Sequence, residues 1–156
     1  MGLRKILTEE EPALHKTCRP VELFDNRLWK LLEDMQETLL ESGGVGLAAP
    51  QVGILRRVVL VDTGEEILEL INPSLVETSG EQEGAEGCLS IPGKYGWVKR
   101  PYYAKVRAQD RNGDWFEVEG EELIARCFCH ELDHLDGILY TQVMDRFLTE
   151  EELSQE

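Results

Sequence analysis

Residues 130–134 read His-Glu-Leu-Asp-His, and they lie inside an apolar segment with helical spacing. An α-helix turns once in about 3.6 residues, so His130 and His134 would fall about 40° apart around the axis and roughly 6 Å apart along it. Both imidazoles can therefore reach one ion, with the Glu131 carboxylate nearby and free to move protons. This pattern indicates metal-assisted hydrolysis.

The sequence around this motif predicts a helix over residues 121–135 that is ended by Gly137. Beyond its first turn only Arg126 and Asp133 form a polar stripe, and we expect these two side chains to face each other. The remaining faces are apolar, which is typical of a buried helix. We therefore expect the two histidines in the interior of the fold, at the base of a cleft, where electrostatic interactions are strong.

Several segments before this helix have the composition of β-strands. They are residues 57–62, 67–78, 97–109 and 115–119. Asn72-Pro73 predicts a bend in the second segment, and Pro101 breaks the third. Asn112-Gly113 predicts a hairpin turn before the last strand, because this dipeptide tolerates positive φ. Strands joined by a hairpin favour antiparallel pairing.

A second helix is predicted near the N-terminus. Residues 25–41 have amphipathic spacing, Asp25 can cap the start, and Gly43-Gly44 end the pattern. The acidic tail, residues 148–156, is expected to fray or to form one short helix.

Size and composition favour a single domain over residues 1–156. The chain is 42% hydrophobic, which suffices for one core. No stretch approaches the roughly 20 apolar residues of a membrane span. No secretory signal is visible, so we expect a bacterial cytoplasmic location with the four cysteines reduced. The net charge of −15 argues against nucleic acid and anionic lipid as partners.

Two histidines do not complete a catalytic metal site, which usually has three protein ligands and an open position. Tyr140 stands where one class of zinc proteases places its third histidine, and His15 lies in a segment without a supporting motif. Cys127 precedes His134 by roughly 10.5 Å of helix rise, too far for both to share the ion with the intervening histidine. Cys88 is the remaining candidate, and a structural cysteine in a glycine-flanked loop is the alternative.

Three segments stand in order along the chain: residues 44–51 (Gly-Val-Gly-Leu-Ala-Ala-Pro-Gln), residues 86–90 (Glu-Gly-Cys-Leu-Ser) and residues 130–134. Together they resemble the three signature motifs of the peptide deformylase family. The resemblance extends from Ile6-Leu7 through the final helix. It implies an α+β fold in which antiparallel β-sheets pack around a buried helix that carries the HExxH motif.

The resemblance also implies roles for the residues that match the motifs. Cys88, His130 and His134 would bind the metal, and Glu131 would be the general acid and base. Metal-bound histidines usually also donate a hydrogen bond to a carboxylate, so we expect such a carboxylate beside His130 or His134.

The other implied roles concern the substrate and the surroundings of the metal. Gln51 and the backbone N–H of Leu89 would stabilise the oxyanion. Val45, Gly46 and Gly87 would hold the substrate backbone in an extended pose. Independently of the resemblance, the closeness of Glu86 to Cys88 in sequence suggests that Glu86 is the carboxylate bound by a metal-bound histidine, with Arg100 anchoring Glu86 by a buried ion pair; two surface charges are the alternative.

The implied reaction is removal of the formyl group from the N-terminal formyl-methionine of new polypeptides, with a metal-bound hydroxide attacking the formyl carbon. The cofactor would be one divalent ion, Fe²⁺ in the cell, with Zn²⁺, Ni²⁺ or Co²⁺ able to replace it. The partner is an N-formylmethionyl peptide. The acidic tail does not support the ribosome contact that some bacterial members make.

Two other functions remain open from the sequence. One is a different metallohydrolase, either a peptidase or a deacylase for another N-acyl group. The other is a metal-binding or interaction module without catalytic activity, although such a module needs neither Glu131 nor Gln51.

Overall fold

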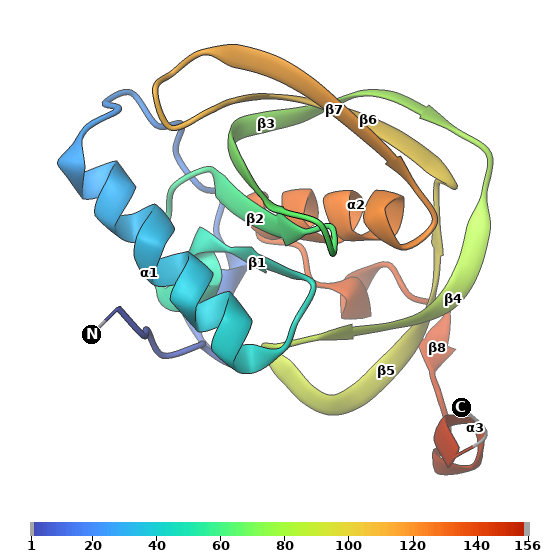
Figure 1. Ribbon diagram of the computed structural model, residues 1–156. Coiled ribbons are helices and arrows are strands. Elements are labelled where there is room, and N and C mark those ends of the chain that lie inside the picture. The colour runs from blue at the N-terminus through green and yellow to red at the C-terminus, as the bar shows by residue number, and fades with distance from the viewer. Residues whose placement is uncertain (1, 155–156) are drawn as a thin grey trace.

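Two antiparallel β-sheets enclose one helix in the computed structural model, which describes residues 2–154 (Figure 1). The larger sheet has five strands in the order β1-β2-β3-β6-β7, and the smaller has three in the order β4-β5-β8. Helix α2 lies between the two sheets, and α1 packs on the outer face of the larger sheet. The predicted α+β class, with antiparallel sheets around a buried helix, is confirmed.

The elements have the following bounds. The strands are β1 (Gly46–Ala48), β2 (Val58–Asp62), β3 (Ile67–Ser79), β4 (Gln82–Cys88), β5 (Ile91–Arg100), β6 (Tyr103–Gln109), β7 (Trp115–Glu121) and β8 (Arg146–Phe147). The α-helices are α1 (Asn26–Ser42), α2 (Leu123–Leu135) and α3 (Glu150–Ser154). Short 3₁₀ turns are η1 (Pro12–His15), η2 (Ala49–Val52) and η3 (Tyr140–Gln142).

Both faces of the larger sheet are covered, as the alternation along β2 shows. Val59 and Val61 belong to the core that includes Phe128 of α2. Val58 and Leu60 belong to the separate core beneath α1. These four valine and leucine side chains of β2 are fully buried, which explains the uninterrupted apolar run in the sequence.

Helix α1 begins and ends at the residues that the sequence indicates. Asp25 caps the start, because its Oδ1 accepts hydrogen bonds from the backbone N–H groups of Arg27 and Leu28 at 3.2 and 3.3 Å. Gly43 ends the helix in the left-handed conformation, φ 73°, and its N–H donates to the Leu39 carbonyl at 3.1 Å.

Helix α2 is slightly shorter than the predicted 121–135. It begins at Leu123, because β7 continues through Glu121 and the chain turns at Glu122, which has φ 54°. Past its C-terminus, Gly137 adopts φ 76°. A Cβ there would lie 2.6 Å from the carbonyl carbon of His15, so this position requires glycine.

Arg126 and Asp133 do not face each other, contrary to the sequence-based expectation. They are seven residues apart, which separates them by roughly 10.5 Å along the helix axis. Asp133 instead accepts a hydrogen bond from Arg100 at 2.8 Å. Arg126 is only 7% exposed and donates to Glu86 at 3.0 Å. The two polar residues therefore do not form one stripe. Arg126 is a buried charge near the start of α2, and Asp133 forms a half-buried ion pair near its end.

The predicted 97–109 segment is two strands that belong to different sheets. β5 ends at Arg100 and β6 begins at Tyr103, with Pro101 between them. The bend expected at Asn72 is present as φ 52° and a register shift in the pairing of β3 with β6. Gly113 has φ 88° in the turn before β7, as the hairpin prediction requires.

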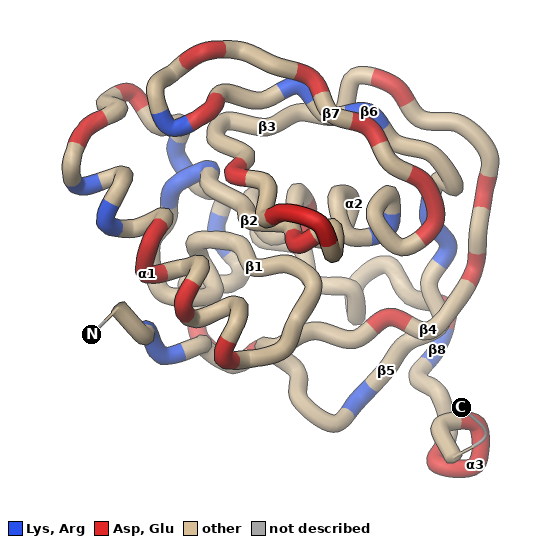
Figure 2. Tube along the Cα trace, in the orientation of Figure 1, with Lys and Arg blue, Asp and Glu red and all other residues tan. Residues whose placement is uncertain are grey.

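The sequence analysis missed β1, β4 and β8. β4 contains two glycines and two glutamates among its seven residues, a composition depleted in strands. The tail forms the short helix α3, and residues 155–156 lie outside the described part of the chain. Figure 2 shows that Asp and Glu positions are spread over α1, the β-strands and α3. Among the described residues, none of the helices is long and apolar enough to cross a membrane.

Candidate active site

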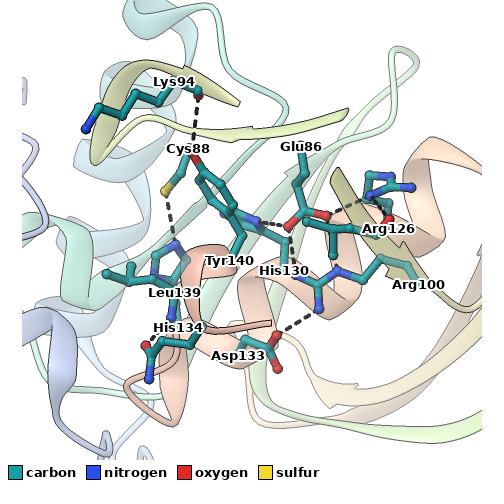
Figure 3. A network of polar contacts seen from close by, with 12 residues as sticks. Glu86, Cys88, Lys94, Arg100, Arg126, His130, Asp133, His134, Leu139 and Tyr140 are labelled. Carbon is teal, nitrogen blue, oxygen red and sulfur yellow. Dashed lines mark hydrogen bonds and ion pairs between the residues drawn. The ribbon is translucent and has the colours of Figure 1, made fainter. Parts of the chain in front are cut away.

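Cys88, His130 and His134 come together although β4 and α2 lie far apart in the sequence. Their ligand atoms, one sulfur and two ring nitrogens, all lie within 4.8 Å of one another. Cys88 Sγ is 3.4 Å from His134 Nε2 (Figure 3). Cys88 is the last residue of β4, just after a register shift in the pairing with β5. This irregularity is typical of strands that redirect a side chain toward a site.

The carboxylate of Glu86 fixes the ring of His130. Glu86 Oε2 lies 2.6 Å from His130 Nδ1, which leaves Nε2 of the ring free to face the cysteine. Arg100 donates two hydrogen bonds to the same carboxylate, at 3.1 and 2.7 Å. Arg126 adds a third cationic contact at 3.0 Å (Figure 3). Burial alone would raise the pKa of Glu86, but the hydrogen bonds from His130 and Arg100 outweigh burial and hold the pKa at about 2.

The donor set fits a divalent transition metal. Thiolate and imidazole are ligands that iron, zinc, cobalt and nickel accept. Burial lowers the pKa of His134 well below its usual value, so this ring is neutral, which is the state that binds a metal. His134 Nδ1 is buried and makes no hydrogen bond with residues 2–154, which leaves Nε2 as the nitrogen directed at the cysteine.

Glu131 lies between the two histidines in sequence, but unlike Glu86 it accepts no hydrogen bond from a histidine or an arginine among the described residues. Its Oε1 is buried without a hydrogen-bond partner among the described residues. Burial raises the pKa of Glu131 to about 7, which suits a group that must both accept and release a proton. At Gly46 in β1, a Cβ would lie 2.7 Å from Glu131 Oε2 and 2.6 Å from Cys127 Sγ. Glycine is therefore needed where β1 passes α2.

Gln51 is held against Cys88 by two neighbours. Its Oε1 accepts a hydrogen bond from the backbone N–H of Ala48 at 2.9 Å, and its Nε2 donates to Ser90 Oγ at 3.1 Å. The same Nε2 lies 3.6 Å from Cys88 Sγ. Leu89 is the residue after Cys88, in the turn between β4 and β5. Both candidate oxyanion donors thus lie beside the proposed metal ligands.

A cavity of about 480 Å³ opens beside these residues. The sequence-predicted residues that line it are Val45, Gly46, Gln51, Glu86, Gly87, Cys88, Leu89, His130 and Glu131. At Gly87 a Cβ would lie 2.6 Å from the ring of Tyr95, so this ring packs directly on the β4 backbone. Because Cys88 and His130 line the cavity, a molecule that enters it can reach both side chains.

Two sequence candidates lie outside the ligand group. His15 is exposed, and its Nε2 is 2.7 Å from the backbone oxygen of Glu9. Tyr140 is buried and supports the site without joining the three ligands. Its ring stacks on His130 with centroids 6.2 Å apart, and its hydroxyl donates to the Lys94 carbonyl at 3.2 Å.

The sequence analysis missed Ser90 as the partner of Gln51 and Arg126 as the second guanidinium on Glu86. Arg126 carried a usable signal, because it stands one helical turn before His130 on a helix that is otherwise buried. Ser90 carried none, since its contact with Gln51 joins residues 39 positions apart.

Comparisons with known proteins show which proteins this chain resembles. The model of the family described as "Polypeptide deformylase" matches residues 3–150. A peptide deformylase of Caldicellulosiruptor bescii is 51% identical over 155 residues, which cover 99% of this chain and 93% of that protein. A crystal structure of a peptide deformylase from Legionella pneumophila has a TM-score of 0.89 at 40% identity, covering 98% of this chain and 90% of that one. The Thermotoga maritima structure has a TM-score of 0.89 at 39% identity, with coverage of 92% and 98%.

Proposed function

The chain belongs to the peptide deformylase family, hydrolases that act on N-formyl-methionyl peptides, and on that premise we propose that Cys88, His130 and His134 hold the metal for this reaction. The observation that carries the proposal is the convergence of one sulfur and two nitrogens within 4.8 Å, beside a cavity and a buried glutamate. We further propose that residues 1–156 act as one catalytic domain.

Glu131 is the proton-transfer group in this proposal. A bound divalent ion lowers the pKa of water and polarises the formyl oxygen. Glu131 accepts the proton of the attacking water and later delivers it to the leaving amine. Its burial and its raised pKa of about 7 support both halves of that role. The amine that leaves becomes the free N-terminus of the peptide.

Gln51 and Leu89 stabilise the negative charge that develops on the formyl oxygen. Gln51 Nε2 lies 3.6 Å from Cys88 Sγ, Leu89 follows Cys88 in the chain, and both residues line the cavity, from which Gln51 Nε2 and the Leu89 N–H donate to that oxygen. One donor of this kind is worth roughly 3–4 kcal/mol, or about 10²–10³ in rate. Val45, Gly46 and Gly87 line the cavity and hold the peptide backbone in an extended pose.

Glu86 and Arg100 orient His130 in the proposal. The two hydrogen bonds from Arg100 keep the Glu86 carboxylate ionised, and this carboxylate fixes the His130 ring through its own hydrogen bond. Such outer partners of a metal ligand fix the ring tautomer and raise the basicity of the coordinating nitrogen.

The resident metal in this proposal is Fe²⁺, with Zn²⁺, Ni²⁺ and Co²⁺ as substitutes. The sulfur and imidazole donors support this set, because they suit borderline and soft ions and not Mg²⁺ or Ca²⁺. We place the reaction in the bacterial cytoplasm, where formylated chains are made. A ribosome contact through α3 is not part of the proposal, since three of its five residues are glutamates and would be repelled by RNA.

The test is one anaerobic preparation that is analysed for metal and assayed on two peptides. The peptides carry formyl-methionine or acetyl-methionine and are otherwise identical. We expect about one metal ion per chain and turnover of the formyl peptide alone. Turnover of the acetyl peptide at an equal rate would indicate a general deacylase, and metal-loaded protein without turnover would indicate a binding module.

A further inference from the structure

One buried cation lies in the wall of the active-site cavity. Arg126 lines the cavity together with Leu123, Cys127 and His130, which lie on the same side of α2. Arg126 precedes His130 by one helical turn, or roughly 6 Å along the axis. A methionine side chain is long enough to extend over this distance when the formyl group lies beside His130. The end of the first side chain of a substrate would therefore reach the level of Arg126.

The guanidinium of Arg126 is fixed in place but keeps free donors. Its Nη1 donates to Glu86 Oε1 at 3.0 Å and to the Val98 carbonyl at 3.2 Å. Nε and Nη2 make no hydrogen bond to any residue in the described range 2–154. Gly84 gives Nη2 its space, because a Cβ there would lie only 3.3 Å from this nitrogen.

From this geometry we infer a further substrate class: N-formyl peptides whose first side chain ends in a hydrogen-bond acceptor, methionine sulfoxide above all. The inference rests on the proposed function. The sulfoxide oxygen is a strong acceptor, and burying it in an apolar pocket without a donor would be costly. The free N–H groups of Arg126 provide that donor. The thioether of methionine is a weak acceptor and gains little from them, so Arg126 is a specificity-determining residue for the oxidised side chain.

The wild-type enzyme gives the first test. Metal-loaded protein is assayed on formyl peptides that differ only at the first residue: methionine, each epimer of methionine sulfoxide, and norleucine, which has the length of methionine without a heteroatom. We expect kcat/KM for at least one sulfoxide epimer to lie within roughly 10-fold of that for norleucine. A larger deficit for both epimers would overturn the inference.

Two arginine variants give the second test. Arg126→Met removes the donors in the cavity and one contact with Glu86. Arg100→Met also loosens Glu86, but Arg100 does not line the cavity, so it is the matched control. The quantity to compare is the ratio of kcat/KM for sulfoxide to kcat/KM for norleucine, since general damage to the metal site affects both substrates equally.

We expect Arg126→Met to lower this ratio by roughly 10-fold or more, because a hydrogen bond to a charged donor is lost. Arg100→Met should leave the ratio unchanged within about twofold. An unchanged ratio in Arg126→Met, or an equal fall in both variants, would refute the role of Arg126.

A variant that does not turn over can still be tested through binding. The deformylated products, which begin with methionine sulfoxide or norleucine, are titrated into both variants by calorimetry. The ratio of the affinity for the sulfoxide product to that for the norleucine product should fall in Arg126→Met and stay unchanged in Arg100→Met. A wild-type enzyme that fails on formyl-methionine itself would contradict the proposed function. A wild-type enzyme that cleaves formyl-methionine but fails the sulfoxide comparison would contradict only this inference.

Discussion

Glu131 shows how the environment of one residue prepares it for proton transfer. The carboxylate is buried, and its Oε1 has no hydrogen-bond partner among residues 2–154. Burial raises the pKa of Glu131 in α2 to about 7, whereas His130 and Arg100 hold the pKa of Glu86 in β4 at about 2 against the effect of burial. The two glutamates thus differ in pKa because hydrogen bonds from His130 and Arg100 stabilise the charged form of Glu86, while burial destabilises the charged form of Glu131.

We predict that Glu131→Gln keeps the metal and loses the reaction. The amide occupies the same volume but cannot accept a proton, so kcat should fall by about 10²–10⁴. Steady-state kinetics and metal analysis of one sample measure both quantities. Glu117→Gln, on the exposed face of β7, is the control and should behave as wild type. A Glu131→Gln variant with near wild-type turnover would show that another group moves the proton.

The spacing in the sequence predicted the closeness of His130 and His134 because a helix fixes the distance between residues four apart. The contacts of Ser90 with Gln51 and of Tyr140 with His130 were not predictable in this way. The first joins η2 to the turn between β4 and β5 through the tertiary fold, and the second depends on where the chain turns after α2.

At the scale of elements, the position of α2 depends on how its ends meet the rest of the chain. Arg57 donates to the carbonyl of Leu135 at 3.1 Å and to Asp136 at 3.0 Å, which satisfies the C-terminus of the helix. Gly137 then turns the chain close against the backbone of His15. These contacts hold the C-terminal end of the helix that carries the two histidines.

We predict that Gly137→Ala destabilises the protein more than Gly64→Ala. Both glycines have positive φ, 76° and 94°, so both substitutions carry backbone strain of about 1–2 kcal/mol. At Gly64 a Cβ meets nothing within 4 Å, whereas at Gly137 it would collide with the backbone of His15. The free energy of unfolding, measured in urea, should fall by at least about 1 kcal/mol more for Gly137→Ala. Equal losses would mean that the chain relaxes around this contact.

The helices were predictable from sequence to within two residues, since their caps and glycines are local signals. The strands were less so. The break at Pro101 within the segment 97–109 was expected, but composition alone does not show that its two parts, in β5 and β6, join different sheets. β4 was missed because its composition is unlike that of a strand, and three of its residues serve the site: Gly84 gives space to Arg126, Gly87 gives space to Tyr95, and Glu86 binds His130.

At the scale of the molecule, the proposed metal joins two layers of the fold. Cys88 belongs to the smaller sheet, and His130 and His134 belong to the helix between the sheets (Figure 1). An ion bound by all three is a cross-link between residues more than 40 positions apart, and it binds only the folded chain. The resemblance implied the α+β class with antiparallel sheets around a helix, and the apolar faces of α2 agreed with it, but the sequence did not show which strands join which sheet.

We predict that removal of the metal lowers the melting temperature. A ligand present at 100 times its Kd stabilises the folded state by about 2.7 kcal/mol, which is lost on chelation. Differential scanning calorimetry with and without a chelator measures the shift. In Cys88→Ser, which lacks the sulfur, the shift should be much smaller, and a full shift in that variant would place the ion elsewhere.

X-ray absorption spectroscopy of the metal-loaded protein tests the central claim most directly, because it counts the atoms around the ion. We predict one sulfur at about 2.3 Å and two imidazole nitrogens at about 2.0–2.1 Å in a zinc-loaded sample, with the sulfur contribution absent from Cys88→Ser. A first shell of nitrogen and oxygen alone in the wild type, or a sulfur signal that persists in Cys88→Ser, would contradict the account.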